Sequence, residues 1–137
     1  MNECLFCKII AGDIPADRMY ENEHVFAFLD ILPTTKGHTL VVPKEHYQNI
    51  HDTPERVMCN IITTAKLLSS VIEKVMGAQG INIHMNNGSV SGQVVFHTHM
   101  HIIPRYDNDG LKLWRGEPYK EGEEKEILKQ IKAQLPH

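Results

Sequence analysis

The sequence has no long apolar run. No stretch of its 137 residues approaches the roughly 20 apolar residues that a membrane-spanning helix needs. The opening residues, Met1-Asn2-Glu3-Cys4, also lack the basic and then apolar pattern of a signal peptide. These absences predict a cytoplasmic protein with no membrane partner.

An excess of basic residues is also missing. The chain carries 14 Lys and Arg against 17 Asp and Glu, a net charge of -3. A basic surface is the electrostatic mark of nucleic-acid binding, so no nucleic-acid partner is expected. Glycine-rich phosphate loops, dinucleotide fingerprints and internal repeats are absent as well. Any phosphate site must therefore be local and built from other residue types.

Cysteine is scarce, with three residues in all. An odd, small number without an export signal argues against a disulfide framework. Cys4-Leu5-Phe6-Cys7 leaves three interpretations open: a redox pair, half of a zinc site, or two ordinary thiols. A redox pair is the least favoured, because such pairs follow a strand and only three residues precede Cys4.

Histidine is plentiful, and three of the nine alternate with other residues between Ser91 and Arg105. If this stretch is a strand, His97, His99 and His101 share one face, about 6.6 Å apart along the pleat. The other face would then pack on the core through Phe96, Thr98, Met100 and Ile102. A face of imidazoles predicts either a metal site or groups that act as nucleophile and proton carriers.

The rest of the pattern predicts one domain over residues 1–137, with a core over 1–110 and an extension over 111–137 that carries a helix over about 121–135. Strands are expected at 18–21, 24–29, 38–43 and 80–86. A long helix should start at Asp52-Thr53-Pro54, with Asp52 as the N-cap, and run to about Met76.

Three details of these elements can be tested. In the strand over 80–86, Ile81, Ile83 and Met85 are expected to face inward. His84 is expected to be a surface histidine. Trp114 either anchors the extension to the core or reaches a partner subunit.

The run His97-Thr98-His99-Met100-His101-Ile102-Ile103 resembles the signature of the histidine triad (HIT) family of nucleotide hydrolases and transferases. In that signature three histidines alternate with apolar residues, and Thr98 is the one polar departure. Gly92-Gln93 also fits the family, and the resemblance extends from about Cys4 to Arg105.

The resemblance implies an α+β, HIT-like fold: about five mainly antiparallel strands, one long helix and a C-terminal helix. It also implies a homodimer that extends the sheet. Members of the bacterial-type branch carry an N-terminal Cys-x-x-Cys and bind a structural zinc ion. On that pattern the ligands would be Cys4, Cys7, His46 and His97. A closed set of four ligands leaves no open position for substrate, so no catalytic metal is expected.

The resemblance further implies a purine nucleotide substrate. His99 would attack its α-phosphate to form a nucleotidyl-histidine, while His101 contacts the phosphate and His38 and His97 orient the cluster. Gln93 would assist near the phosphate and the leaving group. By the same resemblance, the nucleotide-binding residues are Asp30, Ile31, Asn86, Gly92, Gln93, Val94, His99 and His101. From local sequence alone, the favoured interpretation of Asp30 is a residue that starts a turn.

Crowded imidazoles cannot all be protonated, so we expect a neutral nucleophile together with a cation elsewhere in the pocket. Val94 departs from the Ser or Thr that phosphoramidate-hydrolysing members carry there, which removes a hydroxyl that could bond phosphate. The expected activity is hydrolysis of nucleoside 5'-phosphoramidates or related conjugates. Alternatives are a dinucleoside polyphosphate hydrolase, a zinc- and nucleotide-binding interaction module with little turnover, and a catalytic zinc hydrolase that uses the triad as ligands.

Overall fold

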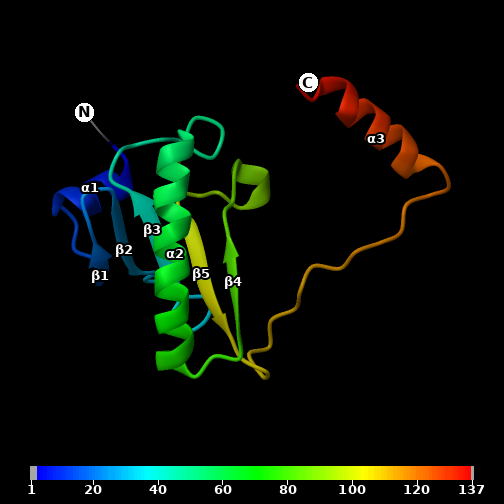
Figure 1. The fold of residues 1–137 in the computed structure, drawn as a ribbon. Helices are drawn as coiled ribbons and strands as arrows, with labels where there is room; N and C mark the ends of the chain where they lie inside the picture. The colour runs from blue at the N-terminus through cyan, green and yellow to red at the C-terminus, as the bar shows by residue number, and fades with distance from the viewer. Residues whose placement is uncertain (1–2, 137) are drawn as a thin grey trace.

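A five-stranded antiparallel sheet forms the centre of the fold in the computed structural model, which describes residues 3–136 (Figure 1). The strands lie in the order β1-β2-β3-β5-β4. Their bounds are β1 Arg18–Glu21, β2 Val25–Leu29, β3 Thr39–Pro43, β4 Gly80–His84 and β5 Met100–Arg105. With the helices below, this confirms the predicted α+β class.

The hairpin of β1 and β2 forms where the sequence predicted it. The Asn22 side chain accepts hydrogen bonds from the backbone N–H groups of His24 and Val25, at 2.8 and 2.9 Å. Such local side-chain bonds are the reason that Asn favours tight turns. The turn then feeds β2, whose Val25 to Phe28 are all buried.

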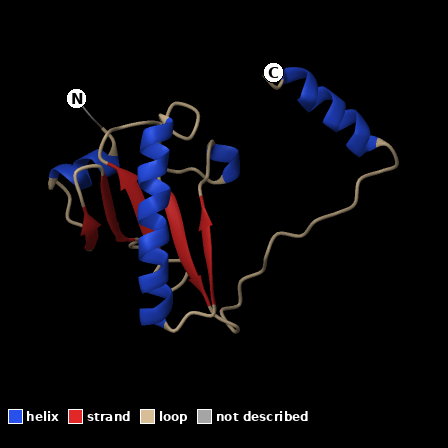
Figure 2. Cartoon of the chain, in the orientation of Figure 1, coloured by secondary structure: helices blue, strands red, loops and turns tan. Residues whose placement is uncertain are grey.

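Helix α2 (Glu55–Met76) crosses one face of the sheet (Figure 2). Its buried apolar residues recur at the helical period and are Val57, Ile61, Ala65, Leu68 and Ile72. They pack in one core with Val41 of β3 and with Met100 and Ile102 of β5. The helix ends at Gly77, whose φ of 65° is a left-handed conformation that glycine adopts at little cost.

The predicted start of this helix is right, but Asp52 is not its cap. The cap position is Pro54, which makes no side-chain cap hydrogen bond. The Asp52 carboxylate instead accepts from the backbone N–H groups of Gln48 and Asn49, both at 2.9 Å. The preceding turn has thus taken up the acceptor that the helix end would otherwise have used.

Helix α1 (Leu5–Ala11) packs on the other face of the sheet. Phe6 and Ile9 are its buried residues, and they contact a second core made of Phe26, Phe28, Leu40 and Val42. Seven residues are too few for a stable helix by themselves. Burial of these two side chains and the cap at Cys4 therefore hold α1 in place.

The triad segment is only partly a strand, which corrects the prediction that it is one from Ser91 onward. The pairing of β5 with β3 ends at Met100 opposite Val41. Two residues earlier the backbone has left the ladder, and the Thr98 N–H donates to the Tyr47 carbonyl at 2.7 Å. His97 and His99 therefore lie before the strand, and Phe96 is partly exposed rather than in the core.

The edge strand β4 corrects two further expectations. Ile81 and Met85 pack against the core as predicted, but Ile83 is 37% exposed. His84 is not a surface histidine. It is half-buried and lies opposite His101 of β5 in the antiparallel register.

The C-terminal extension leaves the sheet as a long loop and ends in α3 (Glu123–Gln134), apart from the other elements (Figure 1). No described residue of α3 is buried. Trp114 is 93% exposed, so it does not anchor the extension to the core of its own subunit. No helix in the described range 3–136 has the length and apolarity to cross a membrane.

Candidate active site and metal cluster

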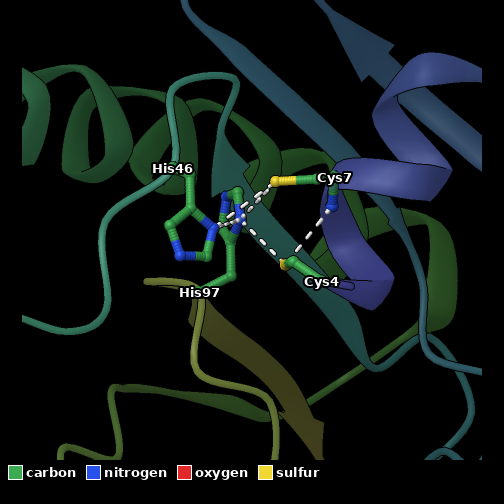
Figure 3. A group of neighbouring side chains, drawn as sticks. All are labelled: Cys4, Cys7, His46 and His97. Carbon is green, nitrogen blue, oxygen red and sulfur yellow. Dashed lines mark hydrogen bonds between the residues drawn. The ribbon is translucent and has the colours of Figure 1, made fainter. Parts of the chain in front are cut away.

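Four residues from three separate segments form a Cys2His2 cluster (Figure 3). Cys4 caps the start of α1, Cys7 lies in its first turn, His46 follows β3, and His97 precedes β5. Their candidate ligand atoms all lie within 4.8 Å of one another. These are the four residues that the resemblance implied.

The hydrogen bonding of His97 leaves an unprotonated nitrogen facing the cluster, as a metal ligand requires. Its Nε2–H donates to the Pro43 carbonyl at 2.8 Å, so Nδ1 carries no proton and faces the cluster. Burial lowers the pKa of His97 to about 4, which keeps the ring neutral. A neutral imidazole whose second nitrogen is bonded to a carbonyl is the usual form of a metal-binding histidine.

The spacing of the ligand atoms fits a small tetrahedral ion. Zinc–sulfur bonds of about 2.3 Å and zinc–nitrogen bonds of about 2.0 Å give tetrahedron edges of roughly 3.3 to 3.8 Å. The observed sulfur–nitrogen distances are 3.4 Å for Cys4 and His97, 3.4 Å for Cys7 and His46, and 3.5 Å for Cys7 and His97. The two Nδ1 atoms lie 3.1 Å apart. The cluster can therefore hold zinc with little rearrangement.

His99 has the protonation state that a nucleophilic imidazole needs. Its Nδ1–H donates to the backbone carbonyl of His97 at 2.7 Å, which leaves the lone pair on Nε2 free of a proton. The ring is 7% exposed, and burial lowers its pKa. Phe6 of α1 packs edge-on against it, with ring centroids 5.0 Å apart at 89°.

A chain of hydrogen bonds fixes the protonation of the other two imidazoles. The Thr34 N–H donates to Nδ1 of His38 at 3.0 Å, so a neutral His38 carries its proton on Nε2. That Nε2–H lies 2.9 Å from Nδ1 of His101 and donates to it. The proton of His101 is thereby placed on Nε2.

Nε2 of His101 is the one buried side-chain nitrogen or oxygen without a hydrogen-bond partner among residues 3–136. A buried donor without a partner costs about 1 to 3 kcal/mol, so it needs an explanation. An acceptor supplied by a ligand would provide one.

A second group of metal-binding residue types, Asp30, His38 and His101, also lies within 4.8 Å. The hydrogen-bond chain argues against a metal there. Because Nδ1 of His38 accepts the Thr34 N–H, its Nε2 must keep a proton and cannot be a ligand. Of the two clusters, the chemistry of the donor atoms suits a metal only at Cys4, Cys7, His46 and His97.

The expected imidazolium in the pocket is wrong for the protein without substrate. Burial is the largest cause that lowers the pKa of His38, His84, His99 and His101, and it brings that of His101 to about 3. All four rings are therefore neutral at pH 7. Charge on a bound phosphate would meet N–H donors rather than a full cation.

The residues expected to bind the nucleotide border this site in two groups. Asp30 and Ile31 follow β2. One carboxylate oxygen of Asp30 accepts from the Leu32 N–H at 2.9 Å, and the other lies 3.7 Å from Nε2 of His38. The turn interpretation of Asp30 is thus confirmed, and its second oxygen remains near the histidines. The Ile31 side chain is exposed.

The second group lies in the loop before His97. Gln93 is 3% exposed, and its side chain bonds the Gln48 and Val95 carbonyls and the Gly88 N–H. It therefore braces the loop, and its contact with substrate stays a prediction.

Two neighbours of Gln93 and Asn86, which follows the end of β4, complete this group. Gly92 has a φ of 107°, and a Cβ there would come within 3.3 Å of the Asn86 amide nitrogen. Val94 is 85% exposed at the loop surface. Because Gly92 has no side chain, the loop backbone can approach a ligand closely there. Val94 offers no side-chain hydrogen bond.

A cavity of about 580 Å³ adjoins His101. Thr34, His38 and Asn86 line it together with His84. The C-terminal extension contributes Leu111, Leu113 and Trp114. His84 is the residue that sequence reasoning missed. Alternation placed it on the outward face of its own strand, but the pairing register that sets it opposite His101 of β5 was not readable from the sequence.

Comparison with known proteins identifies the family. The HIT domain matches residues 11–108. An uncharacterised HIT-like protein of Methanocaldococcus jannaschii is 53% identical over 95% of this chain and 99% of its own length. An adenosine 5'-monophosphoramidase of Schizosaccharomyces pombe is 37% identical over 96% of this chain and 98% of its own. An adenylylsulfatase of Arabidopsis thaliana is 42% identical over 85% and 58%, respectively.

Solved structures agree. A HIT family member from Bacillus subtilis superposes with a TM-score of 0.89 at 41% identity, and the match covers 99% of both chains. A zinc-bound histidine triad protein from Mycobacterium smegmatis gives a TM-score of 0.77 at 36% identity, covering 97% of this chain and 98% of that one. With its triad, its Cys-x-x-Cys and these relatives, the chain belongs to the HIT family of nucleotide-binding proteins and hydrolases.

Proposed function

We propose that the protein hydrolyses nucleoside 5'-phosphoramidates or related nucleotidyl conjugates through a covalent intermediate on His99. The observation that carries this is the pairing of two nitrogens. Nε2 of His99 has a free lone pair, and Nε2–H of the neighbouring His101 has no partner. The first can attack phosphorus, and the second can donate to a phosphoryl oxygen as charge builds on it.

The reaction would proceed in two displacements. The lone pair of His99 Nε2 forms a bond to the α-phosphorus, and the bond from phosphorus to the leaving group breaks with its electron pair. A leaving amine takes up a proton. Water then opens the nitrogen–phosphorus bond, which releases a nucleoside 5'-monophosphate and restores the neutral imidazole.

His101 acts in this scheme as a hydrogen-bond donor and not as a net source of protons. If His101 gave up its Nε2 proton, the deficit would pass to His38, whose Nδ1 is bonded only to the amide of Thr34. A backbone amide cannot release its proton at neutral pH. The chain Thr34, His38 and His101 therefore orients a donor.

Zinc, when bound at Cys4, Cys7, His46 and His97, would supply a structural link between α1 and the sheet. Two contacts connect the metal cluster to the proposed nucleophile, His99. His97 lends its carbonyl to His99, and Phe6 between the two cysteines packs on the His99 ring. We infer no catalytic metal. A cytoplasmic homodimer acting on a purine nucleotide remains part of the proposal.

Intact-protein mass spectrometry after rapid quenching with adenosine 5'-phosphoramidate tests the proposal. We expect an adenylyl adduct on the wild type and none on His99→Ala, with turnover lowered by at least about a thousandfold in the variant. Wild-type turnover by His99→Ala would refute the catalytic assignment. Absence of both adduct and AMP in the wild type would favour a binding module instead.

The leaving group can be assigned by comparing substrates. Adenosine 5'-phosphoramidate, adenylyl sulfate and a diadenosine polyphosphate share the adenylyl group and differ in what departs. The relatives named an adenosine 5'-monophosphoramidase and an adenylylsulfatase support the first two. A kcat/KM that is highest for diadenosine polyphosphate would replace our assignment with a polyphosphate hydrolase.

A further inference from the structure

The rings of His84 and His101 form a parallel stack within the site. Their centroids are 4.7 Å apart, and the ring planes differ by 14°. The two residues are directly opposite in the register of β4 and β5, so the stack is built between paired strands rather than on a loop. Both rings line the cavity beside the triad.

Among residues 3–136, the other two histidine rings that contact His101 are not parallel to it. The His38 ring is tilted by 45° to it and the His99 ring by 62°. His38 holds His101 at one in-plane point, through the bond to Nδ1. A single bond of this kind leaves the ring plane free to rock, and Nε2 has no partner to restrain it.

We propose that His84 is a positioning residue of the active site, which lies flat on His101 and holds its Nε2–H aimed at the reacting phosphate. The inference depends on the proposed function for its kinetic consequence, but the geometry of the stack does not. Stacked aromatic pairs contribute about 0.5 to 1.5 kcal/mol beyond burial, and a donor must be held to within about 10 to 20° to act in a transition state.

The electrostatics agree with this role. Burial lowers the pKa of His84, and the charge that a protonated His84 would carry lowers the pKa of His101 further. The groups facing the stack are His38 of the segment before β3, His99 before β5 and Asp30 after β2. Two stacked neutral imidazoles avoid the repulsion that protonation of either one would introduce.

Three substitutions separate the stack from simple packing. His84→Phe keeps a flat ring without a titrating group, His84→Leu keeps apolar volume without a plane, and His84→Ala removes both. His24→Ala, in the exposed β1–β2 turn, is the matched histidine control. All are normalised to the active-site fraction found from the burst of adenylyl adduct.

We expect His84→Ala and His84→Leu to lower kcat by about five- to tenfold while KM stays within about twofold. His84→Phe should restore kcat to within about twofold of the wild type. Unchanged kcat in His84→Ala would overturn the proposal. Equal loss in His84→Phe and His84→Ala would overturn it too, since the ring plane would then not matter.

A second measurement does not require turnover. Carbon-13 relaxation of the His101 ring gives an order parameter that reports how far the ring rocks. We expect a high order parameter in the wild type and in His84→Phe, and a lower one in His84→Ala. An unchanged order parameter in His84→Ala would refute the positioning role even if no nucleotide is ever turned over, which keeps failure of this inference distinct from failure of the proposed activity.

Discussion

At the scale of single residues, backbone groups decide which nitrogen of each histidine is reactive. The Pro43 carbonyl sets His97, the His97 carbonyl sets His99, and the Thr34 amide sets His38 and through it His101. Each imidazole thus receives its role from one hydrogen bond. The roles that we propose differ although the side chains are identical: ligand, nucleophile, relay and donor.

The relay predicts the effect of removing His38. We expect His38→Ala to lower kcat by about 10- to 100-fold with little change in KM, since residues that orient a reactive group cost this much when lost. His38→Gln should recover part of the loss, because its amide can donate near the position of Nε2. Steady-state kinetics measures both, with exposed His51→Ala as the control. Equal rates for His38→Ala and wild type would contradict the relay.

The low pKa of His101 predicts how stability depends on pH. Burial brings this pKa to about 3, against an ordinary value of 6.5. Between these values the unfolded chain binds a proton that the folded chain does not. The free energy of unfolding should therefore be unaffected by His101 above pH 6.5 and fall below it, by at most about 1.4 kcal/mol per pH unit.

Urea denaturation from about pH 7.5 to about pH 5 measures this slope. His101→Phe, at the same zinc concentration, should give a shallower decline than the wild type. The comparison cancels proton uptake by buried His97, which both proteins share. Parallel curves for the two proteins would show that His101 does not titrate as its burial requires.

At the scale of elements, the site sits where the β3–β5 ladder ends. Val41 is the last residue of β3 that pairs with β5, and Pro43 offers its carbonyl to an imidazole instead of a strand. This break lets the chain present His97 to the metal cluster and His101 to the cavity. A continuous strand would have pointed both histidines the same way.

Helix α1 is the element that metal removal should affect most. We expect about one zinc per chain, and a loss of about 4 kcal/mol in the free energy of unfolding on chelation, if free zinc had been a thousandfold above its Kd. Proteolysis should then reach the α1 segment first. Elemental analysis, thermal melts and limited digestion measure these effects.

Two cysteine variants control this experiment. Cys7→Ser should bind zinc weakly and melt at the same temperature with or without chelator. Cys59→Ser, exposed on α2 and distant in sequence from the cluster, should behave as the wild type. If the wild type melted at the same temperature with and without chelator, that result would contradict a structural metal at this cluster.

At the scale of the whole molecule, the C-terminal extension exposes large apolar side chains. Helix α3 carries the exposed apolar residues Ile127, Leu128 and Ile131, and exposed Leu135 follows its end. The outer edge of β4 is likewise without a neighbouring strand in the five-stranded sheet. Both features are consistent with the predicted dimer, since apolar faces and sheet edges favour association.

Truncation after Gly116 tests this. We expect the folded core to keep its far-ultraviolet spectrum apart from the lost helix, because no residue of α3 is buried. The dissociation constant of the dimer should rise by at least about tenfold, as measured by sedimentation. An unchanged constant would exclude α3 from the interface, and a monomeric full-length chain would refute the dimer.

The sequence by itself determined the order of the elements, from alternation in the strands and the helical period of α2. Its resemblance to the HIT family, carried by the triad and by Cys4 and Cys7, predicted the fold class and the composition of the Cys2His2 cluster. Even so, each zinc-ligand assignment came from a resemblance and not from geometry.

Only the tertiary structure decided how each histidine is hydrogen-bonded. Asp52 does not cap α2, and Gln93 braces its own loop, because their hydrogen-bond partners belong to turns whose shape the sequence does not encode locally. His84 was missed because its partner lies on another strand, and register is set by pairing across the sheet. The tautomers of His97 and His101 likewise depend on the Pro43 carbonyl and on His38, which lie far away in the chain and meet these imidazoles only after folding.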